Sequence, residues 1–244
     1  MKLKKIASLA LAGVMAVSML TACGSNAIDE QPPVDNGGDT TPAAGYSATF
    51  EGRLSAGANA NISMSDSADL NAALKYAMDF AADNHIAWDY NWNHNNTVQF
   101  VNPKGGSDLG VVATELIKKA DSNKEGIVNS WDASEAVKNL LPVTDNSKSM
   151  YYKNDDVDVV MLYVVDGGLS TDAAVMEVAD DLNEDIENLT RIYQSKTETD
   201  VDTGKHTATQ YTYTGSVSAD TITLDANHGK SVTFVAVEIV RELA

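Results

Sequence analysis

The stretch that decides the fold is VDVVMLYVV, residues 157–165. Seven of its nine residues are apolar, and they do not alternate with polar residues as in a strand that has one wet face. Ser231–Arg241 has the same character for most of its length. Strands that are apolar on both faces are typical of the centre of a sheet that is covered on two sides. We therefore expect both stretches to be central strands.

Four segments around these strands have the apolar spacing of amphipathic helices, namely residues 67–83, 108–120, 133–141 and 171–189. Asp66 is placed to cap the first helix and Asp132 the third, and Pro142 ends the third. The fourth segment is the clearest. Its stripe consists of Val175, Val178, Ala179, Leu182, Ile186 and Leu189. Its acidic residues are expected to face solvent; they are Glu177, Asp180, Asp181, Glu184 and Asp185.

Further strands are expected in pairs. The first predicted hairpin joins residues 86–93 to 97–101, and the second joins 190–199 to 206–217 across Asp202-Thr203-Gly204. Weaker strand candidates are residues 46–54, 58–64 and 221–224. Strands and helices alternate irregularly in this order. The sequence therefore predicts an α+β fold, in which about four helices pack on a mixed sheet in a single domain.

The N-terminal 23 residues have the three parts of a bacterial secretion signal. Lys2, Lys4 and Lys5 form a positive start, an apolar stretch follows, and small residues lead to Cys23. The tetrapeptide Leu20-Thr21-Ala22-Cys23 resembles the lipobox of bacterial lipoproteins. This resemblance covers residues 1–23 only. It implies a signal peptide over residues 1–22, cleavage before Cys23, and a lipid on Cys23 that anchors the chain at the extracytoplasmic face of the cell membrane.

Residues 23–45 are expected to form a flexible tether, because prolines, a glycine pair and polar residues leave little apolar area to bury. Aromatic and β-branched residues begin at Tyr46, so the globular domain is predicted to span residues 46–244. Cys23 is the only cysteine, and the domain must therefore be stabilised by its core without disulfides.

Acidic residues dominate the charge of the chain. The whole sequence has a formal net charge of −18. Removal of the three signal lysines would leave 14 basic against 35 acidic residues. A surface so negative repels nucleic acid, which we exclude as a partner. We interpret most of the acids as a solvating surface, and we expect a monomer.

One candidate ligand site lies in the segment Trp88-Asp89-Tyr90-Asn91-Trp92. In a strand, Trp88, Tyr90 and Trp92 would share one face. Three rings on one face can stack against sugar rings, so a glycan is the best-placed ligand. The alternative is that the rings pack beneath a helix as core, which is the commoner environment of large aromatic residues.

No metal site or cofactor is predicted. Two acidic stretches, residues 154–158 and 200–204, lack the spacing of a calcium loop and are interpreted as a strand edge and a hairpin turn. The four histidines are not spaced as metal ligands on a helix; they are His85, His94, His206 and His228.

Motifs of catalysis are equally incomplete. His228-Gly229-Lys230-Ser231 lacks the earlier glycine of a phosphate loop, and residues 105–109 miss the pattern of a nucleophile elbow. Whether the domain catalyses a reaction stays open, and a non-enzymatic binding or scaffolding function is favoured. The alternatives are a hydrolase of envelope or host glycans that uses two carboxylates, and a small-solute-binding lipoprotein.

Overall fold

The computed structural model describes residues 45–86, 98–104, 106–120, 132–141, 157–199, 206–224 and 230–244. From Gly45 onward these residues belong to one compact unit. The helices are α1 (Ser47–Arg53), α2 (Ala56–Asn61), α3 (Ala68–Asp83), α4 (Asp108–Ala120), α5 (Ala133–Lys138) and α7 (Thr171–Glu187). The strands are β1 (Ile62–Met64), β2 (Val98–Phe100), β3 (Val157–Asp166), β4 (Ile192–Thr199), β5 (His206–Leu224) and β6 (Lys230–Leu243). The predicted α+β class is confirmed.

The sheet has the strand order β1-β5-β6-β3-β2, and β4 pairs with β5 outside this path. It is mixed, because β1 runs parallel to β5 while the other pairs are antiparallel. β3 and β6 pair from Val157 opposite Arg241 to Asp166 opposite Val232. β3 is buried almost throughout, and β6 is buried from Val232 to Val237 and again at Ile239 and Arg241, as expected for central strands.

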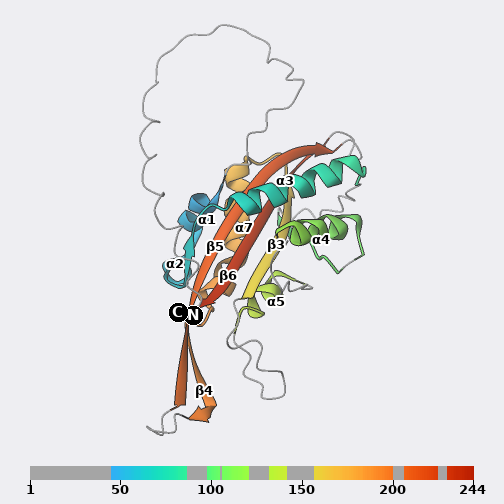
Figure 1. Cartoon of the computed structure of the whole chain (residues 1–244). Coiled ribbons are helices and arrows are strands. Elements are labelled where there is room, and N and C mark those ends of the chain that lie inside the picture. Colours follow the sequence, from blue (N-terminus) through green and yellow to red (C-terminus); the bar gives the residue numbers. More distant parts are fainter. Residues whose placement is uncertain are drawn as a thin grey trace, which may run out of the picture. The chain divides into compact units, whose positions relative to one another are not determined.

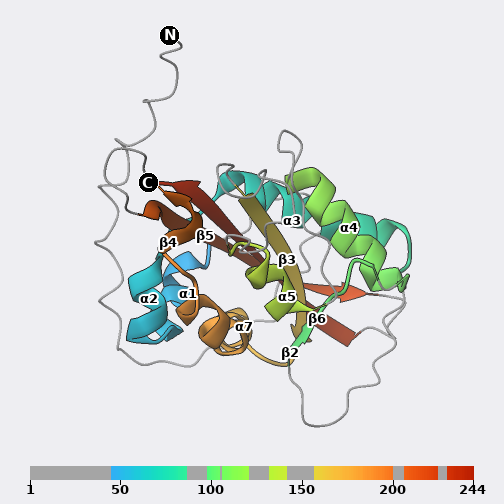
Figure 2. The same cartoon turned by 90° about the horizontal axis from the view of Figure 1, so that it is seen from below.

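Two layers of helices cover the sheet. Figure 2 shows α3 and α4 on one side, with α1, α2 and α7 on the other. Alternate residues of the central strands supply the two cores. On β3, Tyr163 and Val165 pack on the side of α5 and α7, whereas Leu162 and Val164 pack on the side of α3 and α4. The period of two along the strand thus divides one apolar run between two cores.

The predicted second hairpin is present, and it is longer than expected. β5 is a single strand of 19 residues that absorbs the separate candidate at 221–224. Its beginning pairs with β4, and its remainder pairs with β6 from Tyr211 to Leu224. Figure 1 shows β4 and the start of β5 projecting from the rest of the sheet as a two-stranded arm.

Of two weak strand predictions, the one over residues 46–54 was wrong and the one over residues 58–64 was correct only for its last three residues. Residues 47–53 form α1. Residues 58–61 belong to α2, and residues 62–64 form β1. The cause is contact with distant residues. Ser55 caps α2 through its side chain, while its backbone N–H donates to Asn183 Oδ1 of α7 at 2.7 Å. Phe50 is fully buried beneath these helices.

The helix caps were predicted in part. Asp132 caps α5 by accepting a hydrogen bond from the Glu135 N–H at 2.6 Å, as expected, but the helix ends at Lys138 rather than at residue 141. Asp66 does not cap α3. That function belongs to Ser67, whose hydroxyl accepts from the Leu70 N–H at 3.1 Å. Asp66 instead accepts from the Ser47 N–H at 3.1 Å.

We expect Gly167→Ala to destabilise the domain, because a Cβ atom at this turn would overlap the backbone carbonyl group of Ser231. Overpacking of this kind typically costs about 1–3 kcal/mol. Gly52→Ala is the matched control, since nothing lies within 4 Å of its Cβ position and it occupies a helix. The control should be neutral or more stable by about 0.5 kcal/mol. Thermal unfolding of both variants measures the difference, and equal melting temperatures would contradict this packing.

Candidate functional site

Tyr163 is the polar group at the centre of the candidate site. The alternation of β3 directs its side chain to the side of α5 and α7, where it is fully buried. The Phe100 ring meets it edge to face, with 5.7 Å between ring centroids. Among the described residues, its hydroxyl has no partner at standard hydrogen-bond distance. A buried hydroxyl needs a partner, and the group that acts on it at longer range is the Asp181 carboxylate of α7.

Two aspartates of α7 lie near this hydroxyl. Ser170 starts α7 by accepting a hydrogen bond from the Ala173 N–H at 3.3 Å. The apolar stripe of α7 faces the sheet and so fixes how the helix is rotated about its own axis. All six residues predicted for this stripe are buried. Asp181 and Asp185 are four residues apart, so they lie one above the other at the border of this stripe. Like charges in this arrangement repel each other.

The N-terminal end of α5 brings a third carboxylate and a hydroxyl. One carboxylate oxygen of Asp132 accepts the capping hydrogen bond from the Glu135 N–H. The Ser134 hydroxyl donates to Asp185 Oδ1 at 2.8 Å and thereby joins α5 to α7. We call Tyr163, Asp132, Ser134, Asp181 and Asp185 the Asp181 cluster.

The electrostatics of this cluster are uniformly negative. Burial raises the pKa of Tyr163 well above its usual value, and the charges of Asp181, Asp185 and Asp132 raise it further. The phenol therefore stays protonated. Partial burial also raises the pKa of Asp181, with a smaller contribution from Asp185, while a long contact with the Tyr163 hydroxyl opposes the shift. Among the described residues, every group that shifts these two pKa values is a carboxyl or a phenol.

The raised pKa of Asp181 predicts a pH effect on stability. The folded chain binds this proton more tightly than the unfolded chain, so stability decreases as pH rises from the ordinary value of 3.8 through the raised value. Asp181→Asn cannot ionise, and its melting temperature should exceed that of the wild type at pH 7. The gain should vanish below about pH 4. Glu184→Gln on the outer side of α7 is the control, and a gain of the same size there would contradict the argument.

On another side of α7, the charge of Asp180 is paired with Arg53 of α1. Arg53 binds Asp180 through two bonds, with Nε to Oδ1 at 2.8 Å and Nη2 to Oδ2 at 2.6 Å. The prediction that Asp180, Asp181 and Asp185 simply face solvent was therefore incomplete. Asp180 contacts α1, whereas Asp181 and Asp185 lie on the α5 side.

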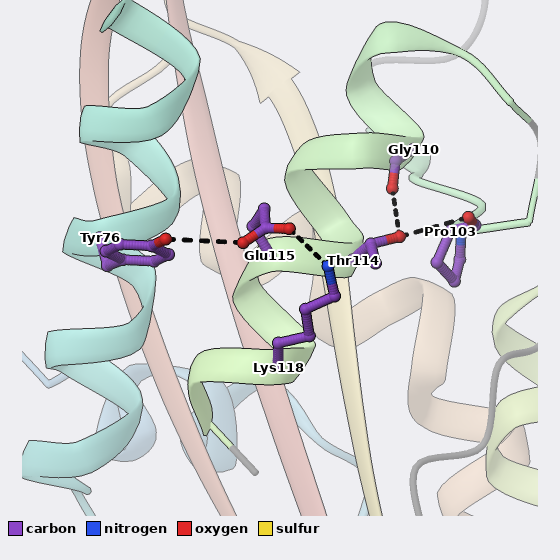
Figure 3. A network of polar contacts seen from close by, with 6 residues as sticks. All are labelled: Tyr76, Pro103, Gly110, Thr114, Glu115 and Lys118. Atoms are coloured by element: carbon purple, nitrogen blue, oxygen red, sulfur yellow. Dashed lines mark hydrogen bonds and ion pairs between the residues drawn. The ribbon is translucent and has the colours of Figure 1, made fainter. Parts of the chain in front are cut away.

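A second polar network joins α4 to its neighbours (Figure 3). Glu115 accepts from the Tyr76 hydroxyl of α3 at 3.5 Å and from Lys118 Nζ at 2.7 Å. The Thr114 hydroxyl donates to the carbonyl of Gly110 at 2.8 Å and contacts that of Pro103 at 3.4 Å. The charges in this network are paired within it, and we interpret it as structural.

Arg241 is a third polar feature and is completely buried. Its Nη1 donates to the carbonyl of Leu140, two residues after the end of α5, at 2.8 Å, and its guanidinium lies 4.9 Å from the Tyr211 ring centroid. Burial raises the pKa of the adjacent Tyr213 to about 12, although the charge of Arg241 opposes this shift. Arg241 thus holds β6 to α5, which is a structural function.

The site residues predicted from sequence fall outside the described part of the chain. This applies to Cys23, to Trp88, Tyr90 and Trp92, to residues 200–204, and to His94 and His228. His85 is described and occupies the turn after α3 with a φ of 49°. Within the described ranges, no three acidic, histidine or cysteine side chains are grouped to hold a metal ion.

Sequence reasoning missed the Asp181 cluster, although a signal existed. At about 100° per residue, Asp185 falls about 60° and Asp181 about 100° from Leu182 around the helix. Both therefore border the apolar stripe instead of opposing it. Tyr163 is likewise the one residue with a polar group on its side of an otherwise apolar strand.

Comparison with known proteins identified no relative of this chain. No protein-family model matches the chain, and neither the curated proteins nor the solved structures give a significant match.

Proposed function

We propose that this chain is a lipid-anchored extracytoplasmic lipoprotein whose α+β domain binds a ligand and does not catalyse a reaction. The observation that carries the proposal is the lipobox ending at Cys23. The first described residue, Gly45, lies 22 positions later and bridges to Ser218 of β5. No helix in the described part of the chain is long and apolar enough to cross a membrane.

The length of the intervening segment suits a tether. A flexible chain of 22 residues has a root-mean-square span of about 25 Å, and it reaches about 75 Å when fully extended. The acidic surface of the domain would be repelled by anionic lipid headgroups. Anchor, tether and charge together favour a domain that is held near the membrane and remains available to ligands.

A glycan is the first ligand that we propose, through Trp88, Tyr90 and Trp92. The described residues on either side of this segment belong to the two cores of the domain. Ile86 is buried in the core beneath α3 and α4, whereas Val98 of the edge strand β2 packs against the core of the opposite face.

The experiment uses a soluble chain from residue 45 with Trp131→Phe, so that only Trp88 and Trp92 emit. Red-shifted emission that becomes blue and protected from acrylamide upon titration with wall polysaccharide would support glycan binding. Blue, quencher-resistant emission that responds to no glycan would assign the rings to a core and remove this ligand.

A hydrolase acting on envelope or host glycans is a second candidate, favoured by the raised pKa of Asp181. Glycosidases pair a protonated carboxylic acid with an ionised carboxylate, and Asp185 lies one helical turn away. The test is release of nitrophenol from aryl glycosides between about pH 4 and 7. Turnover that Asp181→Asn abolishes would support an enzyme, and no turnover by the wild type would remove this candidate.

A further inference from the structure

The two-stranded arm, residues 190–210, is fastened to the domain at its base and continues beyond it (Figure 1). The Tyr213 hydroxyl donates to the carbonyl of Thr190 at 2.9 Å. The Arg191 guanidinium donates to the carbonyl of Ala60 at 3.0 Å. The arm is therefore held in place where it leaves the sheet.

Two strands alone make a weak sheet. An isolated pair is marginally stable in water, and three or more strands are needed for independent stability. Among the described strands, β4 pairs only with β5, and the register between them shifts between Gln194 and Thr199. The outer edge of β4 thus presents backbone N–H and C=O groups for which the described residues supply no strand. Such an edge is a template for pairing with another chain.

The charge of the arm indicates which chain can pair with it. Residues 190–210 contain three basic and three acidic residues, so the formal net charge of −18 belongs entirely to the rest of the chain. The expectation of a monomer rests on that acidic charge, which the arm does not share. Two arms therefore do not repel each other through net charge. A second copy of the chain can approach at the arm.

The length of the arm also separates the acidic parts of two copies. Thr197 lies five residues beyond Ile192, the start of β4, which is about 17 Å along a strand. Two arms that pair antiparallel at Thr197 would hold the starts of their β4 strands about 34 Å apart. Exposed charges are screened within about 8 Å at physiological ionic strength. Repulsion between the two domains is therefore weak in this arrangement.

The sequence of β4 is complementary to itself in one antiparallel register. A two-fold pairing that places Thr197 opposite its counterpart also places Lys196 of each copy opposite Glu198 of the other. A register centred on Lys196 would instead place two lysines opposite each other. Opposite charges stabilise directly opposed strand positions, and like charges destabilise them. The charges of β4 therefore favour the register centred on Thr197.

We propose that two copies of this chain associate through the outer edges of their β4 strands, in an antiparallel register centred on Thr197. The two arms then form one four-stranded sheet in the order β5-β4-β4-β5. This association concerns a partner of the domain and is independent of the ligand that the domain binds.

The first test is an engineered disulfide. The chain from residue 45 contains both cores and no cysteine. Thr197→Cys should form a covalent dimer under mild oxidation, because the two-fold axis brings residue 197 opposite itself, within the range of a disulfide. Ser195→Cys is the matched control. Its two copies would lie about 14 Å apart, beyond the limit of about 7 Å, and should stay unlinked on a non-reducing gel.

The second test exchanges charges and measures mass by light scattering during size-exclusion chromatography. Lys196→Glu places like charges opposite each other twice in the dimer, so it should weaken association at least tenfold. Addition of Glu198→Lys to this variant exchanges the two charges and should restore the dimer. Lys75→Glu makes the same change on the exposed side of α3 and should weaken association less than twofold. Circular dichroism first establishes that each variant is folded.

Three outcomes would overturn the inference. The first is a monomer at every concentration up to the submillimolar range. The second is equal cross-linking of Ser195→Cys and Thr197→Cys, which would indicate random collision instead of a fixed register. The third is a dimer that Lys196→Glu leaves intact, or one that Glu198→Lys fails to restore.

Discussion

Replacing Leu182 with alanine is expected to reduce the free energy of unfolding by about 2–5 kcal/mol. Leu182 lies in the middle of the α7 stripe and is completely buried against the sheet. Alanine preserves the helix, because its helix propensity is at least as high, so the loss comes from the missing side chain and the cavity that it leaves. For a domain of this size, each kcal/mol lowers the melting temperature by about 2–4 °C.

Met176→Ala is the matched control on the same helix. The Met176 side chain is 42% exposed, and its truncation should change the free energy of unfolding by no more than about 0.5 kcal/mol. Urea unfolding followed by circular dichroism measures both variants. If Met176→Ala proved as costly as Leu182→Ala, α7 would be rotated relative to the sheet, and Asp181 would no longer lie beside Tyr163.

The parts of the fold that the sequence predicts well are those determined by local periodicity. The run at 157–165 could only be buried on both faces, and the structure divides it between two cores. The stripe of α7 likewise predicts the buried side of the helix correctly. In both segments many residues repeat the same signal, so a single exception such as Tyr163 does not obscure it.

The failures occur where distant residues decide the structure. Residues 47–61 are small and polar apart from a few apolar side chains, and a short apolar run is ambiguous between strand and helix. They become helices that are held by α7, for example through the Arg53–Asp180 pair and the Ser55–Asn183 bond. A distant contact also decides which residue caps α3. Asp66 accepts a hydrogen bond from the Ser47 N–H, and Ser67 caps the helix instead.

The candidate site belongs to the same class of non-local features. Helical geometry alone indicates that Asp181 and Asp185 border the stripe. It cannot indicate that α5, about 50 residues earlier, lies on that flank and that Tyr163 points beneath it. The meeting of these elements sets the pKa shifts, and those shifts distinguish two aspartates from the many acids of the sequence.

Replacing Cys23 with alanine is expected to remove the protein from the membrane fraction entirely, or to leave an unprocessed precursor. The proposed anchor is a thioether-linked diacylglyceryl group, for which alanine offers no sulfur atom. Each buried methylene contributes about 0.8 kcal/mol, so two long chains anchor stably where a single chain binds only marginally. The domain should then appear in the soluble fraction with its fold intact, because Cys23 precedes the first described residue of the domain, Gly45.

The measurement combines membrane fractionation, metabolic labelling with palmitate and intact mass of the mature chain. Ser25→Ala, a substitution of similar size two residues further along, should remain labelled and membrane-bound. Cys23→Ala that still incorporates palmitate would overturn the lipid anchor. The released Cys23→Ala domain should have the same melting temperature as the wild-type chain. A lower melting temperature would instead indicate that the domain does not fold fully without its anchor.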